Sequence, residues 1–233
     1  MPVITITGLM GSGGPEVGAE VSRKLGVEFV DRRILAEAAK KLGTSVAAVA
    51  ERTERSPKLG DRVAGFVRTV LERSALAGAG ADPYFGGGLD ALLVREYRDF
   101  PEEAGTDDPS SDANLLNVTS AVITELAASG NVVISGRGAN VILRDDPRAV
   151  HVALTSSLDQ RIERIMERVS LDRAEAERYV HENDKGRIAY FQRFFKVQPE
   201  NLHHYHILVN TDWVDVPKAA ELIIAASELI PVR

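Results

Sequence analysis

A glycine-rich segment near the N-terminus has the residue types and the spacing of a phosphate-binding loop. It runs from Gly8 to Glu16, between an apolar segment at 3–7 and a helix predicted at 15–25. Such a turn presents successive backbone N–H groups to a phosphate, and the dipole of the following helix adds to the attraction. The full pattern of these loops has a lysine where this chain has Gly14. We expect the loop to bind phosphate without that lysine. The residues that we expect to take part are Gly8, Gly11, Ser12, Gly13 and Gly14.

A second segment, Gly136 to Asn140, places an arginine directly after an apolar strand predicted at 132–135. In an open parallel sheet, ligands bind beyond the carboxyl ends of the strands, where the glycine loop also lies. We therefore expect Arg137 to reach a phosphate held by the loop, because a planar guanidinium pairs two oxygens at once. The alternative is an arginine that closes a surface turn.

A helix predicted at 158–169 carries three arginines on one face. They are spaced three and four residues apart, which brings their side chains together. These arginines are Arg161, Arg164 and Arg168. One interpretation is a group of cations that faces bound phosphates. The other is a solvent-exposed helix whose arginines pair with Glu163 and Glu167.

Two cations and a carboxylate occur within four residues in the stretch Asp184 to Arg187. Charges of this kind suit a lid that closes over transferring phosphates and stabilises the negative charge of the transition state. Asp31, which follows the apolar segment at 27–31, suits a magnesium ligand that acts through water. It would equally suit the N-cap of a helix predicted at 32–42, because aspartate is a favoured cap.

Short apolar strands alternate with helices along the chain. The strands are predicted at 3–7, 27–31, 132–135, 150–154 and 207–210. The helices are predicted at 15–25, 32–42, 113–129, 158–169, 172–195 and 215–229. Continuous apolar strands that alternate with helices indicate an α/β protein with a parallel sheet covered on both faces. Residues 43–112 combine helical apolar spacing with stretches rich in Gly, Asp and Pro, which indicates an insert.

Composition and charge narrow the classes of function. A chain of 233 residues suits one sizeable domain. The net charge of -6 argues against a general nucleic-acid binder but permits a local basic pocket. The absence of cysteine excludes disulfides and thiolate metal sites. Neither a secretion signal nor a membrane-spanning apolar stretch is evident. We expect a cytoplasmic protein with no membrane or nucleic-acid-polymer partner, and with a homodimer as a candidate assembly.

Together these segments resemble the cytidylate kinase-like branch of the P-loop nucleoside monophosphate kinases. The resemblance runs through 4–31, 130–168 and 184–211. It rests on Gly11-Ser12-Gly13-Gly14, Phe29-Val30-Asp31-Arg32, Gly136-Arg137-Gly138-Ala139, Asp184-Lys185-x-Arg187, and Tyr205-His206 leading to Asn210-Thr211. The order and spacing of these motifs carry the likeness, because none of them is diagnostic alone.

The resemblance implies a three-layer P-loop NTPase fold in a single domain. Its core would comprise 1–42, 113–157 and 196–233, with a helical acceptor-side insert at 43–112 and a helical lid at 158–195. It also implies ATP as the phosphate donor, CMP or dCMP as the acceptor, and Mg²⁺. The residues expected to act in catalysis are Arg137, Arg161, Asp184 and Arg187. We expect Arg168 to join the glycine loop in binding ATP, and Asp31 to bind Mg²⁺.

The sequence departs from the family pattern at three points. Gly14 replaces the loop lysine, Pro15 follows where related chains often carry a basic residue, and Gly138 replaces an acid that reads the acceptor. These departures leave two other hypotheses open. One is a nucleotide-binding module that has lost catalysis. The other is an NAD-binding oxidoreductase, since Asp31 lies 20 residues after Gly11 at the place of a ribose-binding acid.

Overall fold

The computed structural model describes residues 2–31, 97–99 and 109–230. Its strands are β1 (Val3–Gly8), β2 (Glu28–Val30), β3 (Val132–Ser135), β4 (Ala149–Thr155) and β5 (Ile207–Asn210). Its helices are α1 (Gly14–Leu25), α5 (Pro109–Ser129), α6 (Ala139–Ile142), α7 (Leu158–Val169), α8 (Arg173–Phe195) and α9 (Val216–Leu229). Two short 3-10 turns are η1 (Tyr97–Asp99) and η2 (Leu202–His204). The helix predicted at 32–42 and most of the insert predicted at 43–112 lie outside the described residues.

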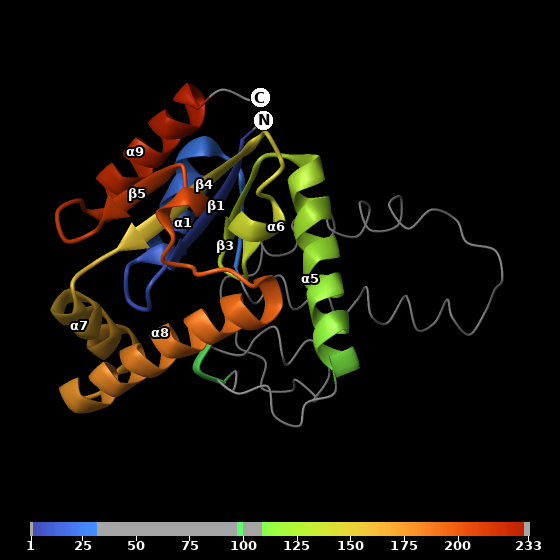
Figure 1. Cartoon of the computed structure of the whole chain (residues 1–233). Helices are drawn as coiled ribbons and strands as arrows, with labels where there is room; N and C mark the ends of the chain where they lie inside the picture. The colour runs from blue at the N-terminus through green and yellow to red at the C-terminus, as the bar shows by residue number, and fades with distance from the viewer. Residues whose placement is uncertain (1, 32–96, 100–108, 231–233) are drawn as a thin grey trace.

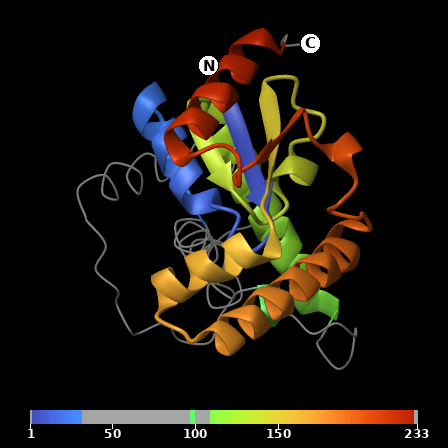
Figure 2. The ribbon, with the colours of Figure 1, turned by 90° about the vertical axis from the view of Figure 1, so that its left-hand side faces the viewer.

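The five strands form one sheet in the order β2-β3-β1-β4-β5, and every neighbouring pair is parallel. This confirms the predicted α/β fold with a five-stranded parallel sheet. Because the strands are parallel, their carboxyl ends open along one edge of the sheet. The loop at 8–14 and the segment after β3 both lie at that edge. Helices α7 and α8 lie beyond it, below the sheet in the views of Figures 1 and 2.

Helices cover both faces of the sheet, with α9 and α5 on opposite sides of it (Figure 1). Successive residues of a strand point to opposite faces, so β1 contributes to two apolar layers. One layer joins the sheet to α1 and α9 and includes Ile4, Ile6, Val17, Val21, Val133, Val152, Ala220 and Ile223. The other joins the sheet to α5 and α6 and includes Val3, Val122, Ile123, Leu126, Val132 and Ile134. These layers fix β1, and with it the start of the glycine loop.

The helix termini differ slightly from the predicted ones for local reasons. Asp172 is the N-cap of α8 and forms a capping box with Glu175, so the helix itself begins one residue after the predicted start. Helix α5 begins at Pro109 instead of residue 113, and proline suits a first helical position. Helix α6 was not predicted, because four residues are too few to show a helical period.

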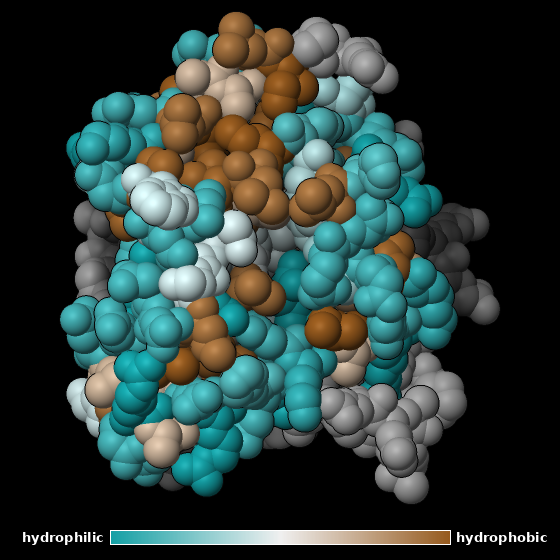
Figure 3. All heavy atoms as spheres, turned by 60° about the vertical axis from the view of Figure 1, so that its left-hand side comes forward, coloured by the Kyte–Doolittle hydropathy of each residue, from teal (hydrophilic) through white to brown (hydrophobic). Residues whose placement is uncertain are grey.

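The face of the molecule seen in Figure 3 has hydrophobic residues gathered near the top, at the height of α9 in Figure 1. The large hydrophobic side chains that α9 and β5 expose are Leu222, Leu229 and Leu208. The predicted homodimer stays a prediction. Within the described ranges, no helix has the length and apolar character needed to cross a lipid bilayer.

The buried His151 of β4 makes the stability of the fold depend on pH. Its Nδ1 lies 2.8 Å from Thr5 Oγ1, and its ring stacks on His206 with 5.0 Å between the ring centroids. Burial, and then the neighbouring His206, lower the pKa of His151 from 6.5 to about 4. The folded state therefore excludes a proton that the unfolded chain takes up as the pH falls. We expect the free energy of unfolding to decrease by about 3 kcal/mol as the pH falls from about 6.5 to about 4.

Urea unfolding at a series of pH values across this range measures the effect. The matched variant is His151→Gln, whose amide does not titrate there, and it is expected to lose most of the pH slope. Equal slopes in the two proteins would show that another group controls the acid side of the stability curve.

Candidate functional site

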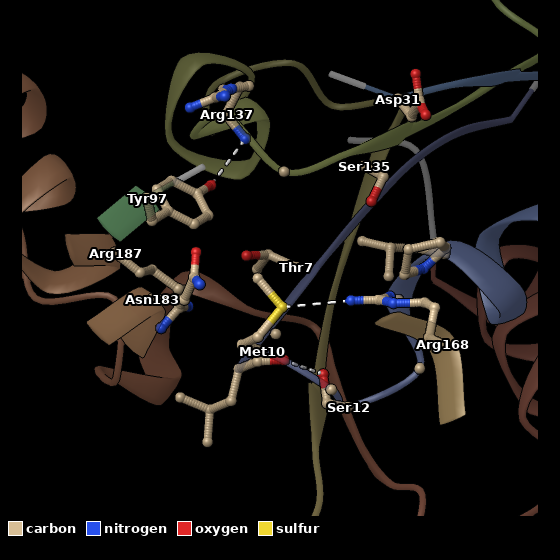
Figure 4. A pocket seen from close by; sticks show the side chains of 18 of the residues that line it. Thr7, Met10, Ser12, Asp31, Tyr97, Ser135, Arg137, Arg168, Asn183 and Arg187 are labelled. Carbon is tan, nitrogen blue, oxygen red and sulfur yellow. Dashed lines mark hydrogen bonds between the residues drawn. The ribbon is translucent and has the colours of Figure 1, made fainter. Parts of the chain in front are cut away.

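A cavity of about 430 Å³ lies at the carboxyl edge of the sheet, over the glycine loop (Figure 4). It is lined by β1 and the loop, the ends of β2 and β3, the end of α7, the middle of α8, and Tyr97 of η1. The residues from the sequence-based predictions that line it are Gly8, Gly11, Ser12, Gly13, Gly14, Asp31, Arg137, Arg168 and Arg187. The structure thus brings together residues that are up to 179 positions apart in sequence (Gly8 to Arg187, 187 − 8 = 179).

The loop presents backbone N–H groups and has tight neighbours. Gly11 and Gly13 have φ values of 83° and 86°, a conformation that favours glycine. A Cβ at Gly11 would lie 2.7 Å from the carbonyl oxygen of Arg161, so α7 approaches the loop too closely for any side chain there. Within the described residues, the N–H groups of Gly11, Gly13 and Gly14 have no hydrogen-bond acceptor. They are therefore available to an anion at the start of α1.

Arg161 and Asp184 bind the backbone of the loop at Met10. Asp184 accepts a hydrogen bond from the Met10 backbone N–H at 3.0 Å, and its other oxygen lies 2.5 Å from Arg161 Nη1. Arg161 also donates to the Met10 carbonyl at 3.3 Å. Arg161 is 7% exposed, which argues against the solvent-exposed alternative for α7. Neither residue is among the described residues that line the cavity, so the geometry favours a positioning role over the catalytic role that we predicted.

A second brace involves Arg164 and Thr211, for which we predicted no separate role. Arg164 donates to the Gly11 carbonyl at 3.2 Å, to Thr211 Oγ1 at 2.9 Å and to the Thr211 carbonyl at 2.8 Å. The Thr211 hydroxyl donates to the Ser12 carbonyl at 3.0 Å. Carbonyl groups of the loop are thus occupied by donors, while the N–H groups of Gly11, Gly13 and Gly14, which line the cavity, have no acceptor within the described residues. The arginine spacing on α7 was the signal that indicated such a cluster.

Arg137 lies in the wall of the cavity beside two aromatic rings. It is 3% exposed and has a φ of 53°, and its backbone N–H donates to the Tyr97 hydroxyl at 3.1 Å (Figure 4). Its guanidinium carbon lies 5.4 Å from the Tyr97 ring centroid and 5.8 Å from that of Tyr190. Cations at such distances from a ring face are attracted to it. Burial argues against the alternative of an arginine that closes a surface turn.

Gly138 lies against the aromatic end of α8. It has a φ of 72°, and a Cβ there would overlap the ring of Phe195. An aspartate at this position would have to displace Phe195, which packs against Tyr190 and Phe191. The contact gives a steric reason for the glycine where the resemblance implies an acid.

Arg187 enters the cavity from α8. Its side chain is buried, and it donates to Glu200 Oε1 at 3.2 Å and to the Tyr205 hydroxyl at 3.4 Å. Burial, the largest influence, raises the pKa of Tyr205 above its ordinary value, so this tyrosine stays neutral at physiological pH. Tyr205 in turn donates to the Pro199 carbonyl at 2.7 Å. These contacts hold the guanidinium in one orientation beside the cavity that Arg187 helps to line (Figure 4).

Tyr97 reaches the site because η1 packs directly on α8 at Gly186. A Cβ at Gly186 would overlap the Tyr97 carbonyl and lie 2.7 Å from the Arg98 backbone nitrogen. We predict that Gly186→Ala forces η1 away from α8 and withdraws the Tyr97 hydroxyl from Arg137. Alanine normally stabilises a helix by about 1 kcal/mol relative to glycine. A lower free energy of unfolding in Gly186→Ala would therefore report the lost contact, and an increase would contradict the prediction.

Asp31 lies at the edge of the cavity, after β2 (Figure 4). In the described part of the chain, no three His, Cys, Asp or Glu side chains come together as a metal-binding group. One carboxylate is nevertheless enough for Mg²⁺ in many phosphate sites, because the ion keeps several waters and binds the phosphates themselves. Three arginines and one aspartate among the lining residues make the cavity attractive to anions.

The fold and the site define a P-loop kinase-like protein. A sequence model of the cytidylate kinase-like family matches residues 3–213. The chain therefore belongs to the cytidylate kinase-like family, which confirms the resemblance drawn from its motifs. A search of the curated proteins gave no match.

One solved structure shows the same fold. An uncharacterized protein from Eubacterium ventriosum ATCC 27560 is 18% identical over 98% of this chain and 99% of that chain, with a TM-score of 0.64. At this identity the likeness concerns the fold alone. Weaker matches are shikimate kinase from Bacteroides thetaiotaomicron, which is 18% identical over 98% and 99% with a TM-score of 0.45, and a gluconokinase from Sinorhizobium meliloti 1021, which is 13% identical over 97% and 91% with a TM-score of 0.46.

Proposed function

We propose that this chain is an ATP-dependent phosphotransferase that acts on CMP, dCMP or a related small phosphate-bearing acceptor. The observation that carries the proposal is the cavity, in which a phosphate loop faces Arg137, Arg168 and Arg187. Phosphoryl transfer requires little covalent chemistry from the protein and depends on positioning and charge stabilisation. The glycine loop and the arginines of the cavity would supply both.

On the donor side, the N–H groups of Gly11, Gly13 and Gly14 would hold the phosphates of ATP at the start of α1. The fit is supported by the lack of other acceptors for these groups within the described residues. Asp31 would hold Mg²⁺ through water, and the ion would neutralise charge on the phosphates.

On the acceptor side, Arg137 and Arg187 would bind the acceptor phosphate and the group in transfer. Two aromatic residues, Tyr97 and Tyr179, are among those that line the cavity, and they would supply apolar contact to a base. We propose that α7 and α8 form the lid predicted at 158–195. The contacts between α7 and the glycine loop would hold the base of this lid in place. The acceptor-side insert at 43–112 remains part of the proposal.

The second candidate function is a nucleotide-binding module without catalysis. Two observations favour it, namely the missing side chain at Gly14 and the presence of Glu16, a carboxylate in the first turn of α1. The dinucleotide alternative is disfavoured by topology. In the Rossmann fold the second strand lies beside the first, whereas here β3 lies between β1 and β2.

The test is ADP release from ATP and Mg²⁺ in the presence of CMP, dCMP, UMP, AMP or GMP. We expect one pyrimidine nucleotide to stimulate release, and mass spectrometry of the product to show one added phosphate. ATP binding by calorimetry with no stimulation by any acceptor would favour the module. Binding of NADH but not ATP would contradict both candidates.

A further inference from the structure

The side chain of Arg168 reaches over the phosphate loop from the last turn of α7. Its Nη2 lies 3.5 Å from Met10 Sδ, and Figure 4 shows the guanidinium pointing across the cavity toward that sulfur. Arg168 also lines a second cavity of about 490 Å³ on the other side of Gly13. Arg168 therefore lines two hollows that Gly13 also lines, and its guanidinium contacts the loop at Met10.

The position of Arg168 is determined by the braces on its own helix. Arg164 and Arg161, one and two turns earlier on α7, are bonded to carbonyl groups of the loop. The base of the Arg168 side chain is thereby fixed relative to Gly11 and Gly13. A cation in this place does not depend on the closure of a distant segment.

Gly14 leaves empty the space that a loop lysine would use. A Cβ at Gly14 would meet no atom within 4 Å, and its φ is not in the positive range that favours glycine. Gly14 and Arg168 line the same cavity. The loop thus lacks its own cation but has a cation from α7 beside it.

Glu16 is the partner of Arg168 in the structure. The distance from Arg168 Nη1 to Glu16 Oε1 is 3.8 Å, and the two side chains are 39% and 48% exposed. An exposed pair at this distance contributes little free energy. A phosphate at the loop would offer Arg168 shorter, charge-assisted hydrogen bonds, so the arginine can exchange one partner for the other.

We propose that Arg168 supplies, from α7, the donor-phosphate cation that a lysine at position 14 supplies in the full loop pattern, and that Glu16 pairs with it until the anion binds. This inference rests on the proposed function, since it concerns the donor side of the same site. Arg168 would thus take the role of the missing lysine. Glu16, although it is acidic, would lie at an anion-binding helix terminus because it pairs with Arg168 while the anion is absent.

The experiment moves the cation from position 168 to position 14. Binding of ATP and of inorganic tripolyphosphate is measured by calorimetry for the full chain and for Arg168→Ala, Arg168→Ala/Gly14→Lys and Arg168→Ala/Gly14→Gln. We expect Arg168→Ala to weaken both ligands about 10- to 100-fold. The lysine double variant should regain most of the affinity, and the glutamine double variant, of similar length but uncharged, should not. Tripolyphosphate isolates the phosphate contribution from that of the base.

Arg173→Ala is the matched control, because Arg173 is exposed, starts the next helix and pairs with Asp159. It should bind both ligands like the original chain. If Arg168→Ala also binds them unchanged, the inference is wrong while the proposed function stands. Equal affinities of the lysine and glutamine double variants would likewise overturn it. If the original chain binds neither ligand, the proposed function fails, and the inference fails with it.

Discussion

Arg187→Ala is expected to lower kcat for acceptor-stimulated ADP release about 100-fold, in line with the loss of one buried donor to a transition state. The affinity for ATP alone should change by less than about threefold, since Arg187 enters from α8 and we propose that the donor phosphates bind at the loop. The guanidinium is buried and is held by Glu200 and Tyr205, so it is oriented before the acceptor arrives. Steady-state kinetics with the stimulating nucleotide, combined with calorimetry for ATP, measure both quantities.

Two variants separate this effect from a general disturbance of α8. Arg193→Ala, on the same helix but not among the described residues that line the cavity, should keep its kcat. Glu200→Gln removes the ion pair and leaves the guanidinium in place, so it should cost less activity than Arg187→Ala. An unchanged kcat in Arg187→Ala would place the acceptor elsewhere.

Asp184→Ala is expected to lower the free energy of unfolding by about 3 kcal/mol, because it leaves the buried Arg161 cation without its carboxylate. It also removes the acceptor of the Met10 N–H, so the loop should lose its shape and ATP should bind more weakly. Urea unfolding and calorimetry are the two measurements.

A double variant tests the origin of this loss. Arg161→Met/Asp184→Leu replaces both charges by apolar side chains, and it should recover much of the stability without recovering ATP binding. Such a split would show that the pair exists to position the loop. If the double variant is no more stable than Asp184→Ala, the unpaired cation is not the cause.

The loop and its neighbours were predictable because their signals are local. Gly11 and Gly13 need conformations that glycine favours, and the apolar segment before them could only be a buried strand. The parallel sheet followed from continuous apolar strands that alternate with helices. The brace behind the loop was not predictable in the same way. Helical spacing put Arg161 and Arg164 on one face, but it could not show that this face meets Met10 and Gly11.

The place of Tyr97 in the site could not be predicted from local sequence signals. It stands next to a stretch whose Gly and Pro residues indicate a loop, and nothing in its neighbourhood marks it as part of a site. Its place depends on Gly186, which lies 89 positions later (186 − 97 = 89) and lets η1 rest directly on α8. The reason for Gly138 was equally hidden, because the ring that excludes an acid belongs to Phe195.

The pairing of β1 has a consequence for biosynthesis. A ribosome completes the glycine loop more than 100 residues before the strands that flank β1, because β1 pairs with β3 at Val132 and with β4 at Ala149. The hydrogen bond to the Ser12 carbonyl can form only after Thr211, 199 positions later, has been synthesised. Contacts of such long range form slowly and late. The loop is therefore synthesised well before the strands and the threonine that hold it in its described shape. A chain terminated before residue 207 would carry the entire loop sequence and still lack its binding site.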